Sequence, residues 1–186
     1  MTKIRRNGCS DKFISYGEAK EYPPFEPHTL HAHEECEIFC VFRGDGYYIT
    51  EGARHKFEPG KIFLMRSGET HMADLCGDEP YERLALHFMP SVADSIDPER
   101  RLLKPFYDRP LGRFNVYDRS VVASTGIYEI FHKMSVCQGD SYANCLHVTS
   151  LLFSVLTELK GLFDAELYLK QTTGSEHMHA VIEYVN

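Results

Sequence analysis

The sequence changes its pattern near residue 118, and this change limits the folds available to the chain. Before that point, glycine and proline interrupt short runs rich in valine, isoleucine, phenylalanine and tyrosine. After it, proline is absent and apolar residues recur at helical spacing. The first part predicts strands at residues 12–17, 28–33, 35–43, 46–50, 53–57, 61–65, 70–75 and 82–88. Many short antiparallel strands favour a mainly β sandwich or barrel of the jelly-roll type, followed by a helical segment.

The turns between the predicted strands support this assignment. Gly44-Asp45-Gly46 suits a tight hairpin that needs positive φ, and Glu51-Gly52 suits the next hairpin. Pro59-Gly60 begins the turn that follows.

Two helices are expected after residue 118. The first begins at Asp118 or Ser120, either of which can cap a helix, and runs to about Cys137. The second begins at Asp140-Ser141 and is apolar on two faces, both of which must be covered. The chain itself covers one face. A partner subunit is the predicted cover for the other, which makes residues 141–163 a homodimer contact. A helix pair packed wholly within one chain is the alternative.

Charge and hydropathy limit the partners of the chain. With 20 basic and 27 acidic residues, the formal net charge is -7 at pH 7, so direct contact with a DNA backbone is not expected. No run of about 18 apolar residues predicts a membrane span, and the start has no apolar signal core, which indicates a cytoplasmic protein. The six cysteines form no CxxC pair and are interpreted as reduced thiols.

The densest chemical signal lies between residues 31 and 37. Alternation on a strand places three polar side chains on one face, namely His31, His33 and Glu37. The same face carries Phe39, Val41 and Arg43, and the opposite face carries Cys36, Ile38, Cys40 and Phe42. A second segment, Pro59 to His71, supplies a third histidine on a later strand. Two imidazoles and a carboxylate therefore converge, with another imidazole nearby.

These two segments resemble the two cupin motifs, HxHx3Ex6G and Gx5PxGx2H. The first motif is matched at every specified position from His31 to Gly44, whereas the second departs once, with Arg66 in place of proline. The resemblance implies a cupin barrel, also called a double-stranded β-helix. It also implies one divalent transition metal (Zn, Ni, Fe or Mn), with the ligands His31, His33, Glu37 and His71. The alternative is that these side chains only line a polar pocket.

The whole layout resembles the amino-terminal domain of AraC-family transcription regulators. The resemblance implies an arm and first strand at 1–24, a cupin ligand-binding barrel at 25–117 and a helical dimerisation segment at 118–166. Residues 167–186 would be a linker and the start of a helix-turn-helix DNA-binding domain that the sequence does not continue into. A third small helix is the alternative reading of residues 176–186.

The AraC resemblance also implies ligand-binding residues. These are Arg43, Arg83 and His87, with Phe39 and His71 in the same pocket, and they suit a sugar, polyol or carboxylate effector. Surface pairing of Arg83 with Glu82 or Glu79 is the alternative. The segment from Tyr16 to Phe25 is expected either to close over the pocket as an arm or to be a plain loop.

The sequence therefore predicts a ligand-sensing and dimerising regulatory domain, not an enzyme. Its partners would be a small-molecule effector, a second copy of itself and, only through the further domain, DNA. The alternative is a small metal-dependent cupin enzyme, an isomerase or dioxygenase, that uses the same four metal ligands.

Overall fold

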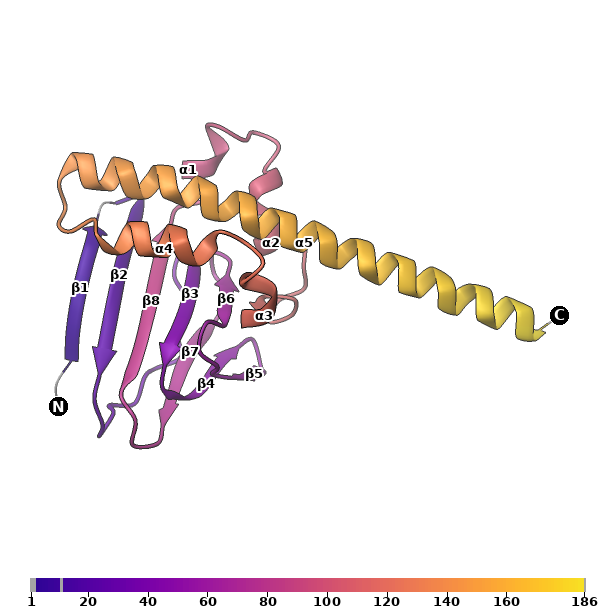
Figure 1. Cartoon of the computed structure of the whole chain (residues 1–186), viewed down its shortest axis with the longest axis horizontal. Helices are drawn as coiled ribbons and strands as arrows, with labels where there is room; N and C mark the ends of the chain where they lie inside the picture. The colour runs from indigo at the N-terminus through magenta and orange to yellow at the C-terminus, as the bar shows by residue number, and fades with distance from the viewer. Residues whose placement is uncertain (1–2, 11, 186) are drawn as a thin grey trace.

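Two antiparallel sheets form the body of the protein (Figure 1). The computed structural model describes the backbone of residues 3–10 and 12–185 and the side chains of residues 9–10 and 12–165. The larger sheet has the strand order β1-β2-β8-β3-β6-β9, and the smaller has the order β5-β4-β7. The strands are β1 (Lys3–Ser10), β2 (Ile14–Glu21), β3 (Cys36–Arg43), β4 (Asp45–Thr50), β5 (Ala53–Lys56), β6 (Ile62–Met65), β7 (His71–Cys76), β8 (Tyr81–Phe88) and β9 (Val116–Tyr117). This is the mainly β cupin architecture that the sequence predicts, although strand pairing among the described residues does not close the two sheets into a barrel.

The larger sheet separates two apolar clusters, because alternate side chains of each strand face opposite ways. Along β3, Cys36, Ile38 and Cys40 point into the cluster shared with the helices. Phe39 and Val41 point into the cluster between the two sheets. The alternation predicted for this strand is confirmed as far as Val41.

Helices cover the outer face of the larger sheet (Figure 1). The short ones are α1 (Ser91–Asp94), η1 (Arg101–Leu103), α2 (Lys104–Tyr107) and α3 (Arg119–Val122), and the longer ones are α4 (Ile127–Ser135) and α5 (Tyr142–Val185). In Figure 1, α4 and α5 lie across the sheet and α5 continues past it towards the C-terminus. The expected linker and helix-turn-helix start at 167–186 fall where side chains are outside the described residues, so that division stays a prediction.

The hairpin between β4 and β5 has the turn that the sequence predicts at Glu51-Gly52. Thr50 pairs with Ala53, which leaves Glu51 and Gly52 as a two-residue turn with φ of 40° and 82°. Positive φ at both central positions is the mark of the turn that matches strand twist, and glycine adopts it without a Cβ clash.

Two expected elements of the first half of the chain differ from the structure. Residues 28–33 form no strand, because only His31 pairs, through two backbone hydrogen bonds with His71. The arm region holds two strands, β1 and β2, since residues 3–10 pair with Ile14–Glu21.

The helix expected from residue 118 to Cys137 is broken. Asp118 does precede α3, as predicted, but the hydroxyls of Ser124 and Thr125 donate to the carbonyls of Val121 and Val122 at 2.7 Å. Such local bonds compete with the helical ladder, and the helix restarts only after Gly126.

Helix α5 is apolar because it is a core helix. By length and composition alone, Tyr142–Ala165 would be long and apolar enough to cross a membrane. Its buried side chains instead pack in the cluster that the larger sheet and α4 share, and these are Cys145, Val148, Leu152, Val155, Leu156 and Leu159. The chain itself therefore uses most of the apolar stripes that suggested a partner.

Candidate metal and ligand site

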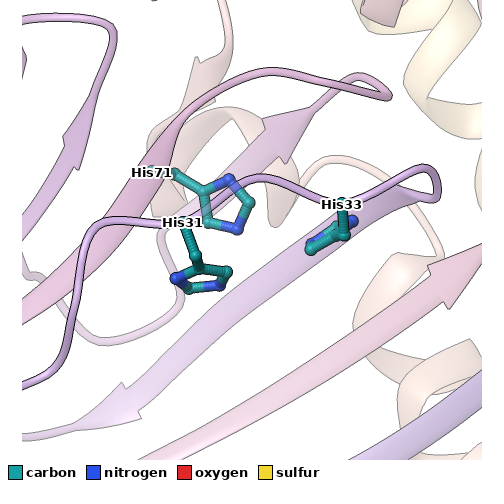
Figure 2. A group of neighbouring side chains, drawn as sticks. All are labelled: His31, His33 and His71. Atoms are coloured by element: carbon teal, nitrogen blue, oxygen red, sulfur yellow. The ribbon is translucent and has the colours of Figure 1, made fainter.

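Four segments bring the candidate metal ligands together at one end of the inner face of the larger sheet, the face that is turned towards the smaller sheet. Glu37 lies in β3, opposite His87 of β8. His33 lies in the loop before β3, and His71 begins β7. The pair of backbone hydrogen bonds between His31 and His71 holds the loop against β7. Figure 2 shows the rings of His31, His33 and His71 gathered around one space.

The Glu37 carboxylate is the centre of this group. Its Oε2 atom lies 3.3 Å from His33 Nε2, 3.0 Å from His71 Nε2 and 3.6 Å from His87 Nε2. Glu37 is 4% exposed, so three imidazoles replace the water that a carboxylate normally binds. We call His31, His33, Glu37, His71 and His87 the His/Glu cluster.

Backbone carbonyls fix how three of the rings present their nitrogens. The Nδ1 atoms of His31, His33 and His71 lie 2.9, 3.1 and 2.7 Å from the carbonyl oxygens of Thr29, Glu35 and Glu69. A carbonyl only accepts, so each Nδ1 carries the proton. In a neutral ring, Nε2 is then unprotonated and its lone pair is free to bind a metal. Metal-binding histidines are usually held in this way.

The electrostatics of the cluster favour a positive species between the imidazoles and the carboxylate. Burial by itself would raise the pKa of Glu37, but the close imidazoles of His33, His71 and His87 outweigh burial and hold the pKa well below its usual value. The hydrogen bond to Glu37 raises the pKa of His33, against the opposing effect of burial. The cluster therefore holds a carboxylate as its charged form and attracts either protons or a cation.

The donor set fits a divalent transition metal. Ligand atoms of His31, His33 and His71 lie within 4.8 Å of one another, and so do those of His33, Glu37 and His87. His71 Nε2 is buried and has no hydrogen-bond partner, although it faces the carboxylate. An aligned, unpartnered imidazole nitrogen beside a carboxylate is what a coordinated ion would satisfy. His31, His33, Glu37 and His71 are the residues that would hold it, with His87 as a further donor that the sequence assigned to the ligand pocket.

The expected ligand residues on β8 share the inner face. Arg83 and His87 lie on the same side of β8, and the Arg83 guanidinium is 5.7 Å from the centre of the Phe39 ring. The alternative pairing of Arg83 is wrong, because Lys20 pairs with Glu82 at 2.6 Å and Arg43 pairs with Glu79. Among the described side chains, Arg83 has no ion-pair partner and is available to a ligand.

A cavity of about 190 Å³ opens beside these two residues. Its inner-face lining is Ser15, Gly17, Ala19, Arg83, Ala85 and His87. The small residues at alternate positions of β2, Ser15, Gly17 and Ala19, leave this space, and their period of two is visible in the sequence. The polar side chains of Arg83 and His87 and the small volume suit a small polar molecule.

Arg43 does not join this site. The register of β3 against β8 shifts between Val41 and Arg43, so the alternation that placed Arg43 on the Glu37 face ends at a bulge. The Arg43 side chain is half-exposed and pairs with Glu79 at the surface.

A buried ion pair behind the cluster was not foreseen. Arg109 donates from Nη1 to Glu69 Oε1 at 2.8 Å and from Nη2 to Glu69 Oε2 at 2.5 Å, with both side chains fully buried. The backbone N–H groups of Arg66 and Gly112 donate to the same carboxylate. No local pattern links residues 40 positions apart, so only the fold shows this pair. It matters to the cluster because the Glu69 carbonyl accepts from His71 Nδ1.

Neither alternative, an arm over the pocket or a plain loop, describes the whole segment from Tyr16 to Phe25. Its first part is strand β2, while Phe25 packs as a partly buried side chain against the cluster between the sheets. The segment therefore reaches the inner face from one side of the fold.

Comparison with known proteins identifies one family. The model of a family described as the AraC-like ligand binding domain matches residues 15–155. No curated protein sequence matches the chain significantly.

Several solved structures resemble part of the fold. A candidate mannose-6-phosphate isomerase from Ralstonia eutropha is 20% identical, with a TM-score of 0.42, over 47% of this chain and 85% of that one. A predicted oxalate decarboxylase from Thermotoga maritima is 26% identical, with a TM-score of 0.37, over 40% and 65%. A cupin-2 domain from Rhodospirillum rubrum is 16% identical, with a TM-score of 0.40, over 46% and 59%.

Proposed function

Because the chain belongs to the family of AraC-like ligand-binding domains, we propose that it is the effector-sensing domain of a cytoplasmic transcription regulator. The effector is a sugar, polyol or small carboxylate that binds on the inner face of the larger sheet. The observation that carries this proposal is the position of Arg83, which has no ion-pair partner among the described side chains, beside His87 and a cavity next to the His/Glu cluster. DNA contact would belong to another domain, since this chain has a net charge of -7.

Each part of the site has a task in this proposal. Arg83 offers a fork of donors to a carboxylate or to vicinal hydroxyls, and Phe39 supports its guanidinium from below. The His/Glu cluster holds a divalent metal, which when bound supplies a Lewis-acidic point for a ligand oxygen. Ligand binding would signal through a difference in free energy between the bound and free arrangements of the helices on the outer face.

A ligand screen tests the sensing function. Isothermal titration with a panel of pentoses, hexoses, polyols and sugar acids should find at least one binder. Arg83→Ala should weaken a bound sugar acid by about 10-fold or more, because a charge-assisted hydrogen bond contributes about 1.5–3 kcal/mol. Arg101→Ala is the control, since Arg101 pairs with Glu99 on the exposed surface. Equal weakening by both variants would contradict the proposed pocket.

Elemental analysis tests the metal. Purified protein should retain about one equivalent of a transition metal, and His33→Ala should retain less than about a tenth, because the site loses a central donor. The exposed His132→Ala is the control. Metal-free wild-type protein would favour the alternative that the cluster only lines a pocket.

The His/Glu cluster also favours a second candidate, a metal-dependent cupin enzyme. The two functions differ in turnover. Repeated conversion of a sugar, sugar acid or phenol that disappears in Glu37→Ala would replace the sensor with the enzyme, whereas binding without turnover supports the sensor.

Homodimerisation through residues 141–163 is proposed for the start of α5. Leu152 and Leu159 are fully buried in their own chain, so they cannot serve as dimer probes. Tyr142 and Leu146 are 82% and 56% exposed and are the apolar side chains left for a partner. Sedimentation at micromolar concentration should give about twice the monomer mass, and Leu146→Glu should give a monomer. His147→Glu, at the neighbouring exposed position, should leave the dimer intact.

A further inference from the structure

Two cysteines from distant parts of the sequence meet on the outer face of the larger sheet. Cys9 is in β1 and Cys145 is in the first turns of α5, and their sulfur atoms are 2.7 Å apart. Cys9 is fully buried and Cys145 is 8% exposed. Unbonded heavy atoms pack at about 3.5–4.0 Å, so the two sulfurs are closer than ordinary packing brings side chains.

The backbone of β1 directs Cys9 to this position. The register of β1 against β2 shifts between Asn7 and Cys9, which marks a bulge at that point. A bulge re-aims the side chains that follow it. Cys9, opposite Tyr16, joins the apolar cluster that also contains Cys145.

The other four cysteines have different surroundings. Cys36 contacts the Tyr107 hydroxyl, while Cys40 and Cys137 donate to backbone carbonyls. Cys76 is exposed. Only Cys9 and Cys145 bring two sulfur atoms together among the described side chains.

The Cys145 side of the pair borders open space. Cys145 lines a cavity of about 470 Å³ that Phe13, Val92 and Leu146 also line. Cys9 is fully buried in the same apolar cluster as Cys145. A small oxidant can therefore approach the pair from the cavity beside Cys145.

We propose that Cys9 and Cys145 form a reversible disulfide that is made when the protein meets a hydroperoxide. The Cys145 thiolate attacks the peroxide oxygen, giving a sulfenic acid and releasing water or an alcohol. The Cys9 thiol then attacks the sulfenic sulfur, which forms the S–S bond and releases water. The two thiols lose two electrons and the peroxide gains two. A thiol reductant reverses the reaction. The structure, which holds all six cysteines as thiols, is the reduced form.

The bond would change how the sheet edge is held. Among the described strands, β1 is at the edge of the larger sheet next to β2, while α5 packs over both strands. A disulfide would tie that edge covalently to the start of α5 and close a loop from residue 9 to residue 145. Closing a loop of this length restricts the unfolded chain strongly. The oxidised protein would have β1 and α5 fixed to each other, independently of whether a ligand occupies the inner face.

Thiol mapping tests the inference. A Cys76→Ser protein, which lacks the exposed thiol, is treated with hydrogen peroxide, alkylated and digested. We expect the loss of two free thiols, a linked peptide pair containing Cys9 and Cys145, and a rise in Tm of about 5–15 °C that a thiol reductant reverses. The digest needs no core substitution, so it stands even if a variant folds poorly.

Two variants in the same background identify the pair. After oxidation, the Cys145→Ser protein should keep the same number of free thiols and the same Tm. Cys137→Ser is the matched control, because Cys137 is 7% exposed in the same core and should oxidise as the parent does. Full alkylation of all remaining thiols after peroxide treatment, or a linked peptide that contains another cysteine in place of Cys9 or Cys145, would overturn the inference.

Discussion

The surroundings of Glu37 and of Glu69 solve the same physical problem in different ways. Both are buried carboxylates, 4% and 0% exposed. Glu69 is paired with Arg109, a cation that keeps its charge, and receives backbone N–H groups from Arg66 and Gly112. Glu37 is surrounded instead by imidazoles, whose charge depends on protons, and one of them, His87, lines a cavity.

The difference separates a structural anchor from an exchangeable site. Every oxygen of Glu69 is satisfied by groups that cannot leave, so the pair holds the segment after α2 against β6. The groups around Glu37 can exchange a proton for a metal or a ligand atom. The two regions are joined, because the Glu69 carbonyl holds His71 Nδ1 at 2.7 Å. The anchor therefore positions one wall of the exchangeable site.

The largest expected effect comes from breaking the anchor. Arg109→Met leaves the Glu69 carboxylate buried without its cation, which should cost about 3–5 kcal/mol of unfolding free energy. Urea denaturation measures this. Arg101→Met is the control, since it breaks an exposed pair and should cost under about 1 kcal/mol. Similar losses for the two variants would show that the buried pair is not an anchor.

Glu37→Gln should reduce stability less than Arg109→Met does, but it should weaken metal binding strongly. The change keeps the shape of the side chain and removes its charge, so unfolding free energy should fall by about 1–2 kcal/mol. Affinity for Zn²⁺ should fall by more than about 100-fold, because loss of a direct ligand exceeds the 10–100-fold loss that supporting residues cause. Metal titration with a competing chelator measures it. Glu34→Gln, an exposed neighbour, should bind Zn²⁺ as the wild type does.

The pH dependence of stability should be the smallest and most specific difference. The raised pKa of His33 contributes stability that is fully present below its ordinary value of 6.5 and is lost as pH rises through the folded-state pKa. Burial would raise the pKa of Glu69, but Arg109 outweighs burial and holds that pKa below its usual value. The pair therefore contributes stability that is present above pH 4.5 and is lost as pH falls through the folded-state pKa of Glu69.

Chelator-treated protein provides the test. As pH rises above 6.5 and through the raised folded-state pKa of His33, the difference in unfolding free energy between wild type and Glu37→Gln should shrink. The difference between wild type and Arg109→Met should stay constant over the same range. A constant difference for Glu37→Gln would mean that His33 gains no charge from its contact with Glu37.

Local patterns in the sequence were sufficient for most strands and for the identity of most cluster residues. The spacing of His31, His33 and Glu37 predicted one shared strand face. The structure does bring these side chains together with His71, but His31 and His33 lie in a loop held against β7. Side-chain alternation is a property of a single strand, so it needs no knowledge of the partner strand. The same reasoning paired Arg83 with His87 on β8.

The sequence did not specify the contacts between partners that lie far apart along the chain. Arg43 leaves the inner face because the β3–β8 register shifts at a bulge, which a single strand does not reveal. His87 reaches Glu37 because β8 pairs beside β3, and His31 meets His71 through an isolated bridge. These placements depend on pairing between segments about 40 to 50 residues apart, which strand periodicity does not specify.

The sequence by itself therefore determined the mainly β architecture, the helical end and the identity of the His/Glu donors. Period-2 and helical patterns and glycine-bearing turns are local, and each limits its own segment. Only the tertiary structure decided that Arg109 neutralises Glu69, that His87 completes the cluster and that Cys9 meets Cys145. Those contacts follow from strand register, bulges and helix packing, which are set by the mutual fit of distant segments.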